Sequence, residues 1–285
     1  MKEVEFKMSD EKIMTVLSQG SVYSSGDLQN LFRLKRGEWS LSSFSAFVKK
    51  LKSLGLVERN LIDSNGVQRK KLFTMDDFDH LECAGRFFNN SYLSHHTALF
   101  FNDLTEQIPK TIYVSYELSP VAGIKKGDLV QSGIDASFSK PGREPETFSF
   151  ASRSVVIHAS KFSGLTGVVK HGSGKFSFTD VERTLIDSAV NPNLSGGIYN
   201  VLNIFQQGRG AYSVDKLLEY LIKLNYSYPY HQVLGFLLER SGAPEEQLSL
   251  FENIGVRYRF YLDREITEPV LSKRWNLIYP GDFDR

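Results

Sequence analysis

The sequence contains a single cysteine, Cys83, among its 285 residues. One thiol cannot form an internal disulfide, and it cannot supply the several thiolates of a metal cluster. Long apolar runs are also missing, since nothing approaches the roughly 20 residues that a membrane-spanning helix needs. The N-terminus MKEVEFKMSD lacks the apolar centre of a secretion signal. These absences predict a cytoplasmic protein that does not enter a membrane.

The usual catalytic motifs are missing as well. The sequence has no G-x-G-x-x-G after a predicted strand, no P-loop, no H-E-x-x-H and no G-x-S-x-G. The pair His95-His96 has the composition of a metal site, but neighbours on a helix point about 100° apart and rarely share an ion. We therefore expect a protein that is not an enzyme and that uses neither a metal nor a cofactor.

The net charge of +1 hides an uneven distribution. Residues 1–75 contain 13 Lys and Arg against 8 Asp and Glu, which gives +5 and leaves −4 for the remainder. A basic segment followed by a mildly acidic one indicates nucleic-acid contact in the first part and another role in the second. The length and a composition with 41% hydrophobic residues suit a folded protein of two domains.

The stretch from Leu41 to Arg59 has the clearest two-faced pattern. Apolar residues recur there at three- and four-residue steps, along one side of a predicted helix. The opposite side is small, polar and basic, with no carboxylate before Glu58. Gly55 is predicted to end the helix, because glycine adopts the left-handed C-cap conformation without a Cβ clash. Such a helix can enter a DNA major groove, although a basic face is often only a solvated face.

Two shorter helices are predicted before this one, from residue 9 or 10 to 19 and from 27 to 32. After it, two extended segments flank Asn65-Gly66, which is a strong hairpin signal. Three helices and a basic hairpin in this order predict a winged helix-turn-helix over residues 1–78. Trp39 is expected to pack in its core. A winged helix that only docks another protein is the alternative, because fold does not fix function.

The candidate DNA contacts divide by position. Residues near the start and centre of the polar helix face are candidates for base edges, namely Ser42, Ser43, Ser45 and Lys49. Cations at the end of the helix, in the connector before it and on the hairpin would mostly meet phosphates, with an affinity that falls with salt. They are Lys50, Lys52, Arg33, Lys35, Arg36, Arg69, Lys70 and Lys71. Asn65 at the hairpin tip is a candidate for the minor groove.

A second domain is predicted over residues 79–285, with a mostly antiparallel sheet followed by helices. Its predicted strands cover residues 107–115, 148–150, 154–158, 165–169, 175–178, 256–262 and 275–280. Its predicted helices cover residues 92–99, 180–190, 197–207, 214–224 and 229–240, with a short one from 244. The fold class is therefore α+β, a winged helix-turn-helix followed by a larger mixed α/β domain. Since no Gly/Ser-rich linker separates the two, we expect them to pack together.

The segment TDVERTLIDS, residues 179–188, has two local signals. Thr179 and Glu182 have the spacing of a capping box, in which the threonine side chain bonds the amide three residues on and the glutamate reaches back. Arg183 and Asp187 are four residues apart on the same helix and predict an ion pair. Both signals give the charged residues structural roles.

Four segments in series resemble a known family. They are YLSHHTALFFNDLTEQIPKTIYVS at 92–115, TDVERTLIDS with the following Gly196-Gly197, YHQVLGFLLERSG at 230–242, and WNLIYPGDF at 275–283. In this order, after the predicted winged helix, they resemble the AbiEi-type antitoxins of type IV toxin–antitoxin systems, and the resemblance covers most of the chain. The connector RLKRGEWS is longer than in a compact helix-turn-helix, which leaves the first residue of the recognition helix open.

The resemblance implies a bacterial repressor of its own operon, encoded beside a nucleotidyltransferase-like toxin and linked to abortive phage defence. It places DNA reading on the winged helix, at Ser42, Ser43, Ser45, Lys49 and Lys50, and inverted repeats in the promoter as the target. It places antitoxin activity on residues 90–285 and implies no catalytic residues. Direct contact with the toxin stays open. A dimer, or two monomers on one inverted repeat, would serve half-site recognition.

Two other functions fit parts of the sequence. A nuclease delivered to DNA would need acidic residues and a lysine at strand ends. The nearest approximation is Asp128, Asp135, Glu144 and Glu146 with Lys140. A one-component sensor would bind a small ligand in the second domain, and an apolar pocket with a few convergent polar groups would favour it.

Overall fold

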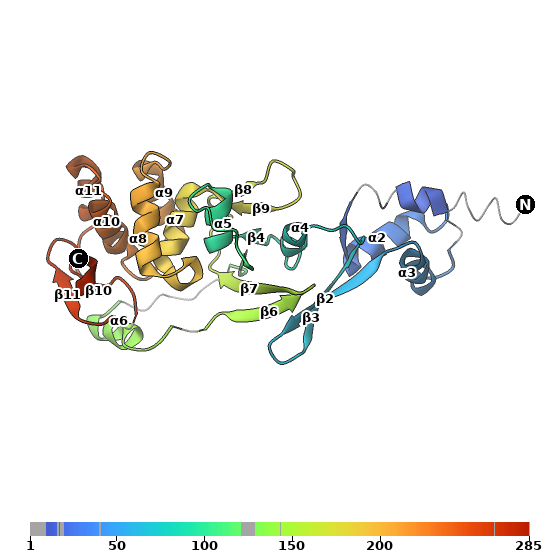
Figure 1. Cartoon of the computed structure of the whole chain (residues 1–285), viewed down its shortest axis with the longest axis horizontal. Helices are drawn as coiled ribbons and strands as arrows, with labels where there is room; N and C mark the ends of the chain where they lie inside the picture. The colour runs from blue at the N-terminus through green and yellow to red at the C-terminus, as the bar shows by residue number, and fades with distance from the viewer. Residues whose placement is uncertain are drawn as a thin grey trace, which may run out of the picture.

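The computed structural model describes residues 10–15, 17, 20–39, 41–120, 129–142, 144–264 and 266–284. The predicted helix cap Ser9, the predicted helix end Gln19 and the candidate acid Asp128 lie outside these residues. Figure 1 shows an elongated molecule, with one group of helices at each end and a twisted sheet between them. Across the described ranges, no helix combines the length and apolar character that a bilayer crossing requires.

Short helices and a hairpin form the N-terminal end. Residues 10–15 and 17 are helical, and the following elements are β1 (Val22–Ser24), α2 (Ser25–Lys35), α3 (Phe44–Ser53), β2 (Val57–Asp63) and β3 (Gln68–Thr74). α2 starts two residues earlier than predicted because Ser24 forms a capping box there, and it ends three residues later. Ser24 Oγ accepts from the amide of Asp27 at 3.1 Å, and the Asp27 carboxylate accepts from the amide of Ser24 at 2.8 Å. The predicted hairpin is confirmed as β2–β3.

α3 begins at Phe44, three residues later than the predicted start at Leu41. Ser43 is the reason, since its hydroxyl accepts from the amide of Ala46 at 3.2 Å and makes it the N-cap. Leu41 and Ser42 therefore precede the helix. The other end is as predicted, because Gly55 lies in the left-handed region with φ of +100°.

The apolar face of α3 forms the core of this end. Phe47 and Leu51 are fully buried, and the ring of Trp39 stacks on Phe47 with 5.6 Å between centroids. The packing role predicted for Trp39 is confirmed. Buried residues of the first helical stretch and of α2, Ile13, Leu17 and Leu28, complete the cluster.

One sheet of nine strands runs through the middle of the molecule in the order β1-β3-β2-β6-β7-β5-β4-β9-β8. Its other strands are β4 (Tyr92–Leu93), β5 (Thr111–Glu117), β6 (Glu146–Phe150), β7 (Arg153–Ser160), β8 (Val168–Lys170) and β9 (Ser177–Thr179). In the predicted second domain, the described neighbours β4–β5, β6–β7 and β8–β9 are antiparallel, whereas β5–β7 and β4–β9 are parallel, so the antiparallel sheet predicted there is met in part.

This sheet crosses the predicted domain boundary at residue 78. Ile62 and Asp63 of β2 pair with Ser149 and Phe148 of β6, so the hairpin continues into the second half of the chain. Figure 1 shows the hairpin turn beside β6, at the end of the hairpin away from α3. A central hydrophobic cluster joins Leu61 and Leu72 of the hairpin to Phe148, Phe150 and other residues of the second half. The expectation that the two parts pack together is thus met by shared strands and a shared core.

The helix α4 (His80–Ala84) lies in the middle of the molecule beside the sheet (Figure 1) and contributes Cys83 and Ala84 to the central cluster. Helices and a small sheet form the C-terminal end. They are α5 (His95–Phe101), α6 (Gln131–Phe138), α7 (Val181–Val190), η1 (Pro192–Ser195), α8 (Ile198–Gln207), α9 (Val214–Leu224), α10 (Tyr230–Arg240), α11 (Glu245–Glu252), β10 (Phe260–Tyr261), β11 (Pro269–Ser272), β12 (Leu277–Pro280) and η2 (Gly281–Asp284). The predicted helices 180–190, 197–207, 214–224 and 229–240 are confirmed to within one residue. α4 and α6 had no counterpart among the predicted helices.

Gly235 and Trp275, from the segments at 230–242 and 275–283, pack against each other. The indole packs on α10 at Gly235, where an added Cβ would lie 2.1 Å from the ring. Its Nε1 donates to Glu239 at 2.8 Å, so the buried ring keeps its hydrogen bond. This contact fastens the C-terminal sheet to the helices.

Two local predictions were wrong. The helix predicted from Tyr92 to Leu99 divides into β4 and α5, because residues 92 and 93 pair with β5 and His95 takes a φ of +48°. The capping box at Thr179 is absent, since the N-cap of α7 is Asp180, whose carboxylate accepts from the amide of Arg183 at 3.0 Å. Glu182 instead bonds the side chain of Lys216 at 2.8 Å.

Candidate nucleic-acid interface

The outer face of α3 and the two residues before the helix carry the polar side chains predicted to reach base edges. Ser42, Ser43, Ser45 and Lys49 are all exposed. Ser45 and Lys49 are four residues apart and share one face of the helix. Within the described part of the chain, the Lys49 ammonium has no hydrogen-bond or ion-pair partner. The hydroxyl of Ser43 accepts from Ala46 as N-cap, and its hydrogen remains available to donate.

Lys50 points to the other side of α3. Its ammonium lies 2.6 Å from Asp10, and both side chains are largely covered. The neighbouring lysines thus have different surroundings, with Lys49 open to solvent and Lys50 holding the first helical stretch against α3. The sequence could not reveal this pair, because 40 residues separate its members.

A carboxylate stands between two other predicted phosphate contacts. Glu58 lies 2.7 Å from Lys52 and 2.8 Å from Lys71. Hydrogen bonds from Lys52 first, and then from Lys71, hold the pKa of Glu58 below its ordinary value. Glu58 therefore offsets one of the two positive charges, and the cluster keeps a net charge of +1.

The hairpin cations are held by neighbours. Arg69 lies 2.6 Å from Asp63, a carboxylate that also accepts from the amides of Asn65 and Val67. These backbone bonds, that from Val67 foremost, lower the pKa of Asp63. An aspartate two residues before the turn residue is a known turn signal that could have been recognised in the sequence. Lys70 lies over the ring of Phe88 at 5.2 Å, which links the hairpin to the second half of the chain.

The connector before α3 is less engaged. Lys35 pairs with Glu38 at 2.9 Å, while Arg33 has only a 3.5 Å contact to Asn30. Arg36 is exposed and has no ion pair among the described residues. Of the nine predicted cations, five are ion-paired: Lys35, Lys50, Lys52, Arg69 and Lys71. The more exposed of these pairs, those of Lys35, Lys52 and Lys71, contribute about 1 kcal/mol or less each, so a phosphate can displace them.

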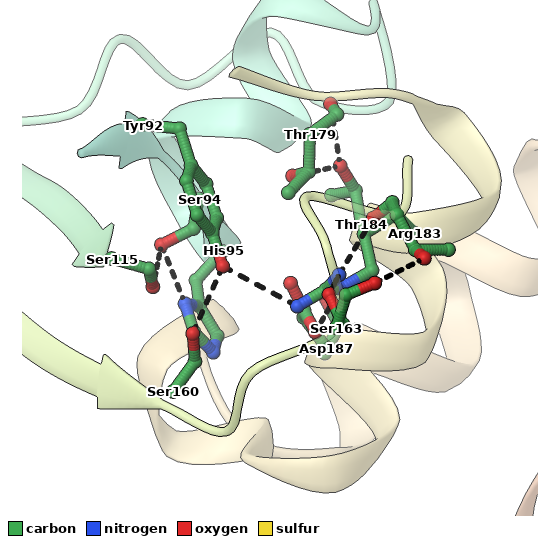
Figure 2. A network of polar contacts seen from close by, with 12 residues as sticks. Tyr92, Ser94, His95, Ser115, Ser160, Ser163, Thr179, Arg183, Thr184 and Asp187 are labelled. Atoms are coloured by element: carbon green, nitrogen blue, oxygen red, sulfur yellow. Dashed lines mark hydrogen bonds and ion pairs between the residues drawn. The ribbon is translucent and has the colours of Figure 1, made fainter. Parts of the chain in front are cut away.

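A second polar site lies between α7 and the sheet, and sequence reasoning missed most of it (Figure 2). Arg183 and Asp187 form the predicted ion pair at 2.8 Å, but the arginine is only 2% exposed, so the pair is buried. Arg183 also donates to the carbonyl of Thr166 at 2.6 Å and to the hydroxyl of Tyr92 at 3.4 Å. The sequence placed this pair on a helix without showing that the sheet covers it.

Hydrogen bonds from this site continue into the sheet in a fixed direction. Ser160 donates to the carbonyl of Tyr116 at 3.1 Å, so it must accept from Tyr92 at 3.0 Å, and Tyr92 in turn accepts from Arg183. Burial raises the pKa of Tyr92 to about 12, so the phenol stays protonated. The chain of donors thus starts at a permanent cation and ends at a backbone carbonyl.

Two histidines lie next to this chain. Nδ1 of His95 forms a hydrogen bond with the hydroxyl of Ser94 at 2.9 Å. The ring centroids of His95 and His158 are 5.4 Å apart. Nε2 of His95 and Nδ1 of His158 are buried and have no hydrogen-bond partner among the described residues. Burial first, with the charge of Arg183 adding to it, lowers the pKa of both imidazoles, so both rings are neutral near pH 7.

The acidic residues considered for other chemistry are dispersed. Asp135 on α6 bonds Gln131, Tyr261 and Arg259, while Glu146 lies on β6. No group of three or more His, Cys, Asp or Glu side chains suited to a metal occurs among the described residues. His95 and His96 turn to different neighbours, His158 and Tyr113 respectively.

Comparison with known proteins yields a similarity of fold. No family model and no curated protein matches the chain. Among solved structures, the crystal structure of the RV2827C protein from Mycobacterium tuberculosis superimposes with a TM-score of 0.55. The match has 14% sequence identity and covers 95% of this chain and 91% of that chain. At this identity the similarity shows the fold alone, a mixed α+β architecture along nearly the whole length of both proteins.

Proposed function

We propose that this protein is a DNA-binding transcriptional autorepressor and antitoxin of a type IV toxin–antitoxin system. In this proposal the N-terminal part acts as a winged helix-turn-helix, with α3 as recognition helix and β2–β3 as wing. The observation that carries it is the outer face of α3, where Ser45 and Lys49 are exposed and no described carboxylate pairs with the lysine. A small polar face of this kind fits a major groove.

The exposed lysine is the main base contact in this proposal. Lys49 lies in the middle of α3 and can donate to the acceptors O6 and N7 of a guanine. Ser45, one turn earlier, can donate or accept, and the Ser43 hydroxyl can donate. Arg33, Arg36 and Lys70 are not held by carboxylates in the described chain and would contact phosphates.

The five ion-paired cations would contact DNA only after exchanging a carboxylate for a phosphate. Such an exchange leaves the carboxylate free to attract a counterion, so the net release of counterions is smaller than for contact by a free lysine. The affinity for DNA should therefore fall less steeply with salt than nine unpaired cations would predict. The wing is also tied to β6, which limits its movement toward DNA. Recognition would therefore depend mainly on α3.

A band-shift titration tests the DNA-binding part. The full-length protein is titrated on the DNA upstream of its own gene and on a scrambled duplex, at two salt concentrations. We expect selective, salt-sensitive binding, and a loss of about tenfold in affinity for Lys49→Ala. Lys170→Ala removes an exposed lysine from β8 and is the matched control. Equal binding to both duplexes, or equal effects of the two variants, would contradict α3 as the reading element.

The antitoxin role is assigned to residues 90–285, and a different experiment tests it. Co-expression with the neighbouring nucleotidyltransferase-like protein should restore growth, and Lys49→Ala should protect as well as the wild type. Rescue that disappears with Lys49→Ala would mean that repression alone protects the cell. Recovery of the toxin in a pull-down would distinguish direct contact from action on the toxin's target.

A further inference from the structure

A cavity of about 190 Å³ lies beside the buried pair of Arg183 and Asp187. It is formed by parts of the chain that are distant in sequence, β5, β7, α7 and the segment after α9. Its polar lining includes the charged side chains of Lys161, Arg183 and Asp187 and the polar side chains of His158, Asn191 and Tyr226. Val190 and Leu224 contribute apolar wall. Engineered apolar cavities of roughly 150 Å³ hold benzene, so this space suits a single ring.

Several lining groups have unused hydrogen-bonding capacity. The Asp187 carboxylate accepts from Arg183 through Oδ1, and Oδ2 has no partner among the described residues. Tyr226 has no hydrogen bond within that part of the chain, although burial raises the pKa of its phenol. Nδ1 of His158 is buried and unpaired as well. Of these three atoms, only Nδ1 of His158 is buried without a partner among the described residues. Asp187 Oδ2 and the Tyr226 hydroxyl line the cavity with hydrogen-bonding capacity that a polar ligand can use.

The buried ion pair favours a neutral occupant. Arg183 and Asp187 neutralise each other at 2.8 Å, and the third charge of the lining, the ammonium of the exposed Lys161, donates to the carbonyls of Leu224 and Asn225 at 3.5 and 2.7 Å. A carboxylate ligand would approach Asp187 as closely as Arg183, and a charged group would lose its hydration on entry. A neutral molecule avoids both costs.

The lining also determines which edge the occupant presents. Asp187 Oδ2 accepts only, since the carboxylate is ionised, while Arg183 Nη2 donates only and makes a single long contact to Tyr92. The Tyr226 hydroxyl can donate beside them. Adjacent acceptor and donor groups are complementary to an N–H next to a C=O, which is the edge of a cyclic amide.

We propose that this cavity binds a small, neutral, planar cyclic amide of the size of a pyrimidine base. Its N–H donates to Asp187 Oδ2, and its carbonyl accepts from Arg183 and Tyr226. The ring lies between Val190 and Leu224. This inference concerns residues outside the DNA-binding part and does not rest on DNA binding.

Calorimetric titration of the full-length protein tests the proposal, with uracil as the probe at neutral pH and without DNA. We expect saturable binding of uracil and at least a tenfold weaker interaction with 1,3-dimethyluracil, which has lost both N–H donors. Benzoate and L-alanine test an anion and a zwitterion of similar size, and neither should bind. Absence of uracil binding, equal binding of the dimethyl analogue, or preference for benzoate or alanine would overturn the proposal.

A pair of matched variants then locates the ligand. Tyr226→Phe removes one hydroxyl from the cavity and should raise the Kd for uracil roughly fivefold. Tyr228→Phe removes a hydroxyl that bonds Ser137 at 3.1 Å outside the cavity, and should leave the Kd unchanged. Thermal melts confirm that both variants fold. Equal effects of the two changes on the Kd would show that uracil binds elsewhere and would overturn the assignment.

Discussion

The outer face of α3 and the Arg183 site use charge in opposite ways. On α3, Lys49 is exposed and unpaired within the described chain, so its charge is available to a partner. At the second site, Arg183 is only 2% exposed and bonds Asp187, Thr166 and Tyr92. An exposed charge contributes little to stability, whereas a buried one must be satisfied within the fold. The first region can therefore change with its partner, and the second cannot change without affecting the fold.

The largest expected effect comes from breaking the buried pair. Asp187→Ala leaves the Arg183 guanidinium without its carboxylate and should lower the free energy of unfolding by about 3–5 kcal/mol. Glu219→Ala breaks the exposed pair with Lys223, which lies on α9, and should cost less than about 0.5 kcal/mol. Urea denaturation of both variants measures the contrast. Similar losses in the free energy of unfolding would show that burial does not make the Arg183–Asp187 pair more important for stability than the Glu219–Lys223 pair.

The next effect is a loss of stability in acid caused by the two buried histidines. Their pKa values lie below the ordinary value in the fold, so the unfolded chain binds protons that the folded protein does not. Stability should therefore be full above pH 6.5 and fall below it, by up to about 1.4 kcal/mol per pH unit for each histidine.

The double variant His95→Asn, His158→Asn checks this pH dependence. Its melting temperature should change less between pH 7.5 and pH 5.5 than that of the wild type. Some dependence should remain, because burial also lowers the pKa values of His96 and His231. An unchanged slope would mean that the pair does not control acid stability.

Adjacent lysines on α3 allow a sharper comparison within the first region. Lys49→Ala should weaken promoter binding about tenfold and leave the melting temperature unchanged, because the ammonium has no described partner. Lys50→Ala should weaken binding less than about threefold and lower stability slightly, by at most about 1 kcal/mol, because it loses Asp10. The reverse order of effects on DNA would assign the reading face to Lys50.

The smallest expected effect separates two serines at the start of α3. Ser43→Ala removes the N-cap and should cost about 1 kcal/mol, whereas Ser42→Ala precedes the helix and should stay within about 0.5 kcal/mol. Thermal melts of the two single variants, compared with the wild type, measure this difference. Equal costs would place the helix start elsewhere.

The helices and the hairpin were predictable because their signals are local. Apolar spacing located α3, and Asn65-Gly66 located the turn between β2 and β3. The predicted start of α3 was three residues too early, because Leu41 extends the apolar pattern toward the N-terminus. In the structure the helix begins after Ser43, whose side chain caps it through a single hydrogen bond. Pattern alone cannot decide between these two influences.

The relations between distant segments were not predictable. Arg183 and Asp187 were found as a pair, but their burial depends on β5 and β7, which cover them after folding. His95 was considered with His96, its neighbour in sequence, while its neighbour in space is His158. The ion pair that engages Lys50 also needs a partner from another element, Asp10, which is 40 residues away. A single sequence contains no record of these contacts.

The pairing of β2 with β6 means that the two halves of the chain each complete the other's sheet. A break at residue 78 would leave unpaired N–H and C=O groups on both strands and uncover Phe148 of the central cluster. Bare strand edges with apolar neighbours are templates for association between chains. Separation of the two halves, by a protease or by an interrupted gene, would therefore favour aggregation of both products over two independently soluble modules.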